Sequence, residues 1–282
     1  MKPIYIFGRR RIRDLEKQNK ELWSSLAMTQ ESRDEARKEA DYNKKVNEIL
    51  FEKCKEYDFE YMVEITNVKV YDLRESVIAC RNAMRTEPAE YTDEEFEKSL
   101  ERAVKLAKSP SNSGRANFLK GIRVSYDIKY PNYFSPELQR YGFNDIVSSS
   151  SKMHRLLKMD LDKACNKYVT RNSIRELKKY IDFYNYFLLC DESKFAEDTL
   201  VRFRNLEEFN IHTRQDALYY AFMFVLSNCP QGIELFMRCS TNYMQLRNIY
   251  HQRKTHRLRE DWGAFCKFIE ELPYFKEFIN PE

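Results

Sequence analysis

The sequence predicts an α+β protein, with a small, mostly antiparallel sheet flanked by helices and a long helical arm before it. Two or three strand-like segments precede residue 130, and helical periodicity dominates after residue 155. Residues 9–57 are strongly charged and contain no glycine or proline. With 282 residues the chain can form one large domain or two small ones. We assign residues 1–56 to the arm and 57–282 to the domain.

The composition excludes several classes of protein. Hydrophobic residues make up 43% and aromatic residues 14%, so the chain can bury a core, while only 6 glycines and 8 prolines argue against a turn-rich sandwich or barrel. The net charge of +4 (48 minus 44) is too small for a dedicated nucleic-acid binder. No apolar run approaches the roughly 18 residues of a membrane span. At the N-terminus a short apolar run precedes the basic residues, whereas in a signal peptide the basic residues come first and a longer apolar run follows. The sequence therefore predicts a soluble, cytoplasmic protein.

The seven cysteines are scattered and form no CxxC pair. No cysteine and histidine share zinc-finger spacing. We therefore expect reduced, mostly buried thiols and no metal site.

In the arm, Ile12, Leu15, Leu22 and Leu26 recur at near-heptad spacing among charged residues. This pattern is typical of a long exposed helix that forms a short coiled coil. A solvated helix without a specific partner fits it equally well.

The first half of the domain alternates between strand and helix patterns. Residues 59–65, continuing to 68–70, are rich in β-formers, and 73–84 has helical spacing. Thr92 is expected to cap a helix, with Glu95 completing a capping box. After the loop 109–114, a strand is expected within 118–128, with the four apolar side chains of Ile122, Val124, Tyr126 and Ile128 on one face. A helix that begins at Ala116 is the competing interpretation of this segment.

The second half is expected to be mostly helical. Pro136 is placed to open a short helix. Longer helices are expected over 155–168, 171–190, 215–227, 232–257 and 260–271.

One candidate site is the serine run Ser148–Ser151, which is followed by Lys152, His154 and Arg155. Hydroxyls and free backbone N–H groups at such a turn can hold a phosphate. A plain serine-rich loop with a helix cap also explains the run.

A second candidate is the segment Ser240–Arg259. On a helix, Asn242, Gln245, Ile249, Arg253 and His256 fall on about one face. Such a stripe suits a polar, anion-binding cavity, with the arginine as the fork for phosphate or carboxylate. A solvated basic helix face is the competing interpretation.

The sequence contains no dinucleotide-binding, P-loop, zinc-protease or serine-hydrolase motif. The two candidate segments together resemble flavin-dependent thymidylate synthases. The similarity is greater to the divergent relatives of phage and gut bacterial genomes, which carry N-S-x-S-x-M-H where the family has N-E-x-S-x-R-Y. Here this half of the motif is Ser148–His154. The resemblance implies that Ser149, Ser150 and Ser151 bind the phosphate of dUMP, and Met153 stands where the family has an arginine.

The second segment is similar to the family pattern N-x-R-S-L-x-N/H-F-L-x-L-R. Asn242, Asn248 and Arg253 fall in register with it. The resemblance implies that both asparagines lie at the flavin and that Arg253 reaches the nucleotide. A third match, Ser109-Pro110 followed by Arg115, resembles S-P-x-E-H and implies that Arg115 contributes to the cofactor site.

The resemblance covers about residues 57–282 and implies methylation of dUMP to dTMP. Methylenetetrahydrofolate would supply the carbon, and FAD that has been reduced by NADPH would supply the hydride. This scheme requires no protein nucleophile, and no catalytic residue is identified. Because family members are homotetramers, it also implies a homo-oligomer. Two other hypotheses stay open: a nucleotide-binding or regulatory protein on the same fold, and an interaction protein that recruits a partner through its coiled-coil arm.

Overall fold

The computed structural model describes residues 60–110, 113–190, 211, 213–281 and five positions of the arm. Backbone contacts divide the chain into two units: Phe59–Lys254 with Leu258–Glu282, and Met1–Asp58 with Thr255–Arg257. The described arm residues, among them Arg33 and Arg37, are helical and exposed. The leucine stripe lies outside the described residues, so the coiled coil stays a prediction.

The first unit is built on a four-stranded sheet. The strands are β1 (Glu64–Tyr71), β2 (Arg123–Pro131), β3 (Asp145–Ser149) and β4 (Glu234–Asn242). Their order is β1-β2-β4-β3, and every neighbouring pair is antiparallel. The predicted α+β class is thereby confirmed.

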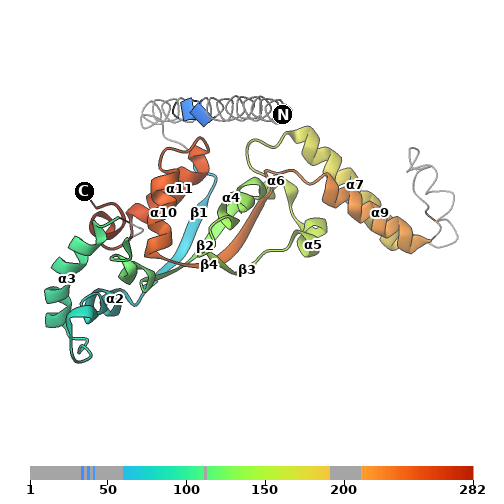
Figure 1. Ribbon diagram of the computed structural model, residues 1–282. Helices are drawn as coiled ribbons and strands as arrows, with labels where there is room; N and C mark the ends of the chain where they lie inside the picture. Colours follow the sequence, from blue (N-terminus) through green and yellow to red (C-terminus); the bar gives the residue numbers. More distant parts are fainter. Residues whose placement is uncertain are drawn as a thin grey trace, which may run out of the picture. The chain divides into compact units, whose positions relative to one another are not determined.

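Helices flank this sheet, and α10 and α11 lie on the same side of it (Figure 1). The α-helices are α2 (Leu73–Ala79), α3 (Asp93–Ala107), α4 (Ser135–Gln139), α5 (Lys152–Arg155), α6 (Leu161–Ala164), α7 (Arg171–Leu189), α9 (Arg214–Ser227), α10 (Tyr243–Arg253) and α11 (Arg259–Glu270). Short 3₁₀ helices are η1 (Asn82–Met84), η3 (Asn117–Lys120), η4 (Asn132–Phe134) and η5 (Leu156–Lys158), and η7 (Phe275–Ile279) is a short π-helix.

The core lies between the sheet and the helices. The four residues that were predicted to face inward are fully buried: Ile122 just before β2, and Val124, Tyr126 and Ile128 within it. Trp262 and Phe265 of α11 pack against this face, with the ring of Phe265 5.8 Å from that of Tyr126. The alternation of large apolar residues therefore predicted the buried face correctly.

The expected helix over 232–257 is wrong in its first half. Residues 234–242 form β4, which is central in the sheet between β2 and β3. Its leucine, methionine and arginine residues suit a helix, yet Leu235, Met237 and Cys239 alternate and are buried against the helices. Pairing along the whole length of β2 outweighs the local helix preference. The sheet is thus not confined to residues before 130.

Other boundaries also differ. The strand expected from 59 starts at Glu64, and the helix expected over 73–84 ends at Ala79 before the short η1. The helix expected over 155–168 is broken into the short segments α5, η5 and α6. The Thr92 cap is confirmed, since its Oγ1 accepts the Glu95 N–H at 3.2 Å. The Glu95 carboxylate instead pairs with Arg81 and Arg85, so no capping box is completed.

Helices α7 and α9 form an antiparallel hairpin with its own small cores. The Arg214 guanidinium, at the start of α9, donates to the Phe187 carbonyl at 2.7 Å near the end of α7. Farther along, the rings of Tyr180 and Phe224 stack at 5.6 Å. Ala217, Ala221 and Val225 form the buried seam of α9. Within the described residues, no helix is long and apolar enough to cross a bilayer.

Gly121 is required where η3 approaches α2. A Cβ atom at this position would overlap the Ser76 hydroxyl. We expect Gly121→Ala to lower the free energy of unfolding by about 1–3 kcal/mol, because both segments are buried and cannot separate freely. Chemical denaturation would measure it, with Gly142→Ala as the control, since nothing lies within 4 Å of a Cβ there. Equal effects of the two variants would contradict this prediction.

Candidate functional site

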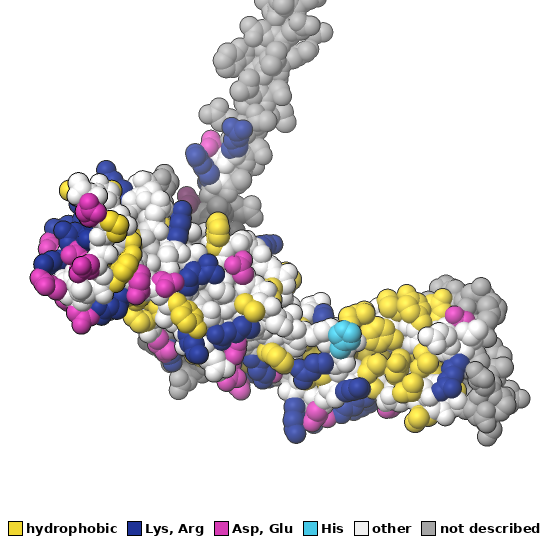
Figure 2. Space-filling model, turned by 90° about the horizontal axis from the view of Figure 1, so that it is seen from below, with side chains coloured by type: hydrophobic (Ala, Val, Ile, Leu, Met, Phe, Trp, Pro, Cys, Tyr) yellow, Lys and Arg dark blue, Asp and Glu magenta, His cyan; other side chains and the backbone are white. Residues whose placement is uncertain are grey.

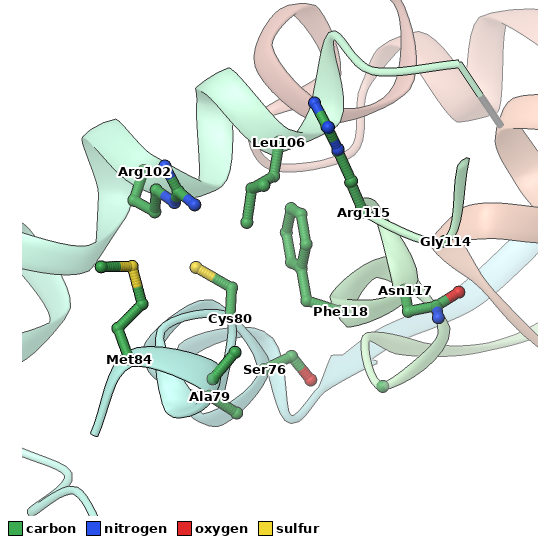
Figure 3. A pocket seen from close by; sticks show the side chains of 12 residues that line it. Ser76, Ala79, Cys80, Met84, Arg102, Leu106, Gly114, Arg115, Asn117 and Phe118 are labelled. Atoms are coloured by element: carbon green, nitrogen blue, oxygen red, sulfur yellow. The ribbon is translucent and has the colours of Figure 1, made fainter. Parts of the chain in front are cut away.

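A groove of ≈ 560 Å³ lies between α2, α3 and η3 and is here called the α2–α3 groove (Figure 3). Its volume falls within the range of small-molecule sites. The lining residues come from both helices, from η1 and from the loop into η3: Ser76, Ala79, Cys80, Ala83, Met84, Arg102, Leu106, Gly114, Arg115, Asn117, Phe118 and Gly121.

Two arginines give the groove its charge. Arg102 extends from α3 and Arg115 from the loop before η3, with Leu106 and Phe118 between them in this view (Figure 3). Arg102 and Arg115 are both exposed, and neither forms an ion pair with a carboxylate of the described residues. The groove therefore combines an apolar wall with two guanidinium groups that are available to an anion.

Neighbouring arginines are used differently. Arg81 and Arg85 share the carboxylate of Glu95, and Arg74 pairs with Asp93. These pairs hold the start of α3 against α2 and leave no carboxylate of theirs for the groove. The positive charge of the groove thus comes from Arg102 and Arg115.

Cys80 adds a thiol to the wall of the groove. Burial raises the pKa of this thiol, although Arg102, Arg81 and Arg85 oppose the shift. The thiol form therefore dominates at neutral pH, and Cys80 is not an activated nucleophile. The arrangement favours binding an anionic ligand rather than covalent catalysis.

Asn242 and Asn248, predicted to lie at a flavin, are both on or beside α10. Asn242 is the N-cap: its Oδ1 accepts the Gln245 N–H at 2.9 Å, and the residue is 8% exposed. Asn248 is half-buried and lies six residues later, a little under two helical turns. The Oδ1 atom of Asn242 is thus engaged in starting the helix at the end of β4.

Arg253, predicted to bind the nucleotide, lies in an aromatic and acidic environment at the end of α10. Its Nη2 is 3.0 Å from Oε2 of Glu137, and its Nε donates to the Tyr141 hydroxyl at 2.7 Å. The guanidinium carbon lies 4.6 Å from the ring centre of Trp262. Only 14% of the side chain is exposed. A phosphate that binds Arg253 must compete with the Glu137 carboxylate.

The serine run lies at the end of β3, the strand that pairs with β4, and leads into α5. Ser149 belongs to β3 and is exposed, and the Ser150 hydroxyl accepts the Phe236 N–H at 3.0 Å. Ser150 also donates its N–H to the Phe236 carbonyl at 2.8 Å. Ser151 stands at the start of the four-residue helix α5, without a side-chain capping bond. The pairing with Phe236 explains why these residues extend β3 rather than form a free loop.

The predicted residues therefore fall into three places. Asn242, Asn248 and Arg253 belong to the β4–α10 segment, Ser149–Ser151 to the edge strand and α5, and Arg115 to the α2–α3 groove. In the contacts of the described residues, Arg253 and Ser149–Ser151 share no partner. Convergence of Ser151 and Arg253 on one cavity stays a prediction.

Sequence reasoning missed Arg102, because an exposed arginine on an amphipathic helix gives no signal of a ligand. It also missed Asp261, which is 2% exposed and accepts the Tyr133 hydroxyl at 3.1 Å. Burial, with a smaller contribution from the charge of Glu260, raises the pKa of Asp261 to about 6. A buried, perturbed carboxyl near the aromatic cluster is detectable only once α11 is packed.

The raised pKa of Asp261 predicts a pH dependence of stability. The folded state binds the proton of the Asp261 carboxyl more tightly than the unfolded chain does. The protonated carboxyl therefore contributes fully to the free energy of unfolding below the ordinary pKa near 3.8, and this contribution is lost as the pH rises through about 6. This rise of the Asp261 pKa to about 6 corresponds to roughly 3 kcal/mol. We expect Asp261→Asn to have a higher Tm than the native chain at about pH 8, with the difference shrinking toward about pH 4. A difference independent of pH would contradict this assignment.

No protein-family profile matches the sequence, and no curated protein does. Solved structures do resemble the fold. A flavin-dependent thymidylate synthase ThyX from Helicobacter pylori, complexed with FAD and dUMP, is 16% identical with a TM-score of 0.42, over 76% of this chain and 97% of that one. A second structure of the same enzyme with both ligands is 16% identical with a TM-score of 0.41, over 78% and 96%. The function proposed below therefore depends on the residues of this chain.

Proposed function

We propose that this protein binds a phosphate-bearing cofactor of the flavin class, FAD, in the α2–α3 groove, and the pyrimidine nucleotide dUMP through Arg253 and the serine run. The observation that supports it most directly is that Arg102 and Arg115 lie beside an apolar wall and form no ion pair with a carboxylate of the described residues. One of them, Arg115, is among the residues to which the sequence resemblance assigns a cofactor role, together with Asn242 and Asn248.

The groove suits part of such a cofactor chemically. Arg102 and Arg115 can each donate two parallel hydrogen bonds to a pyrophosphate, and Phe118 and Leu106 offer apolar contact to a ring. Asn117 adds an amide that both donates and accepts. A bound flavin would supply hydride chemistry, while these side chains hold and orient it.

The reaction we propose is the methylation of dUMP to dTMP, with methylenetetrahydrofolate as carbon donor and NADPH as reductant of FAD. The role of this chain is placement and electrostatic stabilisation, because the scheme needs no protein nucleophile. This fits the protonated state of Cys80 and of Cys266, whose pKa is raised by burial to about 12.

A binding protein without catalysis is the second candidate. The Glu137–Arg253 ion pair favours it, because the arginine is already neutralised within the chain. Met153, and Met244 two residues after Asn242, stand where the family patterns have arginines. Fewer cations at both sites would weaken the grip on nucleotide and flavin.

Purification of the full chain distinguishes these functions. A yellow protein that releases FAD, and that forms dTMP when given dUMP, methylenetetrahydrofolate and NADPH, supports the enzyme. A colourless protein whose Tm rises with dUMP but not with FAD supports the binding protein. A chain that binds neither ligand would refute both and leave the interaction protein.

A further inference from the structure

The hydroxyl group of Tyr141 joins two side chains at the end of α10. Its oxygen accepts the Nε–H of Arg253 at 2.7 Å, and it donates its proton to Oε1 of Gln252 at 3.1 Å. A guanidinium group has donors only, so the phenol oxygen can meet Arg253 only as an acceptor, and its single proton is left for Gln252. Burial raises the pKa of Tyr141, although the hydrogen bond from Arg253 opposes the shift, so the phenol keeps this proton at neutral pH.

This hydrogen bond fixes the orientation of the Gln252 amide. One end of an amide accepts hydrogen bonds and the other donates two, and a free glutamine can turn either end toward a partner. Because Tyr141 donates to Oε1, the NH₂ group of Gln252 is turned away from the phenol. Gln252 is exposed, and its NH₂ group has no hydrogen bond to the described residues. The end of α10 therefore offers two N–H donors beside Arg253.

The donors of Gln252 distinguish two kinds of pyrimidine. At position 4 of the ring, uracil carries a carbonyl oxygen, which accepts, whereas cytosine carries an amino group, which donates. An amide held as a donor can bond the first and is left facing another donor by the second. Charge cannot make this distinction, because dUMP and dCMP carry the same phosphate, and Figure 2 shows basic and acidic side chains mixed over the described part of the face that it views.

We propose that Gln252 is a specificity-determining residue: its NH₂ group donates to the 4-carbonyl oxygen of a uracil nucleotide whose phosphate binds Arg253. Tyr141 is the positioning residue that holds the Gln252 amide in this orientation. The family pattern has leucine at the position of Gln252, so the resemblance assigns this residue no role. The inference rests on the proposed function and adds what the site selects, namely uracil over cytosine nucleotides.

The test is calorimetry of the full chain with dUMP and with dCMP, and the measured quantity is the ratio of the two dissociation constants. The native chain should bind dUMP more tightly by about tenfold or more, because dCMP leaves the amide donors unmatched. In Gln252→Glu, Tyr141 can still donate to one carboxylate oxygen and the other oxygen accepts, so the ratio should shift toward dCMP by about tenfold or more. The added negative charge weakens the binding of both nucleotides equally and cancels in the ratio.

Tyr141→Phe separates orientation from structure. Without the phenol proton the Gln252 amide can turn over, so the preference for dUMP should fall toward equal binding. A purely structural loss, such as a displaced Arg253, would weaken both nucleotides alike and leave the ratio unchanged. Tyr133→Phe is the matched control: it removes another partly buried hydroxyl, which donates to Asp261 at 3.1 Å, and should preserve the native ratio. Circular dichroism would verify that each variant folds.

The outcomes separate this inference from the function on which it rests. An unchanged ratio in Gln252→Glu would overturn the role of Gln252 even where dUMP binds, and an unchanged ratio in Tyr141→Phe would overturn that of Tyr141. An equal loss of preference in Tyr133→Phe would overturn the special role of the Tyr141 hydroxyl. A native chain that binds neither nucleotide would refute the proposed nucleotide site, and this inference with it.

Discussion

Replacement of Arg253 by alanine is expected to weaken dUMP binding by about ten- to a hundredfold, because a charged hydrogen bond to phosphate contributes about 1.5–3 kcal/mol. The same variant should lose about 2–3 kcal/mol of unfolding free energy, since it leaves Glu137 without its cation and removes the contact with Trp262. Calorimetry measures the first effect and chemical denaturation the second.

Two further variants separate binding from structure. Lys254→Ala removes an exposed cation one position along the chain and should change neither quantity. Glu137→Gln removes the carboxylate that competes for Arg253, so dUMP affinity should rise. If Glu137→Gln weakens dUMP binding as much as Arg253→Ala does, the pair is structural and Arg253 does not bind the nucleotide.

How far the sequence predicted the fold depends on whether local pattern and packing agree. In β2, the aromatic and β-branched residues Val124, Tyr126 and Ile128 favour a strand and also face the core, so both signals coincide. In β4, Leu235, Met237 and Cys239 alternate as a strand does, but their types suit a helix equally well. The pairing of β4 with β2 and β3 decides the outcome, and it joins residues that lie 88 to 119 positions apart.

The candidate sites show the same limit. Asn242 was identified by its register, and the structure explains part of the pattern by its role as helix cap. The partners of Arg253 come from α4, from the segment after it and from α11, and no local spacing connects them. Likewise, the α2–α3 groove unites Arg115 with Arg102 only through the packing of α2 against α3 and η3. Side chains that act in a site but lie far apart in sequence are therefore visible only after folding.

Charge reversal in the α2–α3 groove should have the largest effect on FAD. Arg102→Glu and Arg115→Glu each replace a phosphate-binding cation by an anion, so each should weaken FAD binding by at least about tenfold and the double variant by about a hundredfold or more. Fluorescence titration of the full chain with FAD measures this. Lys120→Glu is the matched control: it changes the net charge equally, at the end of η3, but Lys120 does not line the groove. Salt should weaken the native complex but scarcely affect the double variant, since its attraction is gone. Native FAD affinity in the double variant would show that flavin binds elsewhere, and a loss equal in Lys120→Glu would show that net charge rather than the groove is responsible.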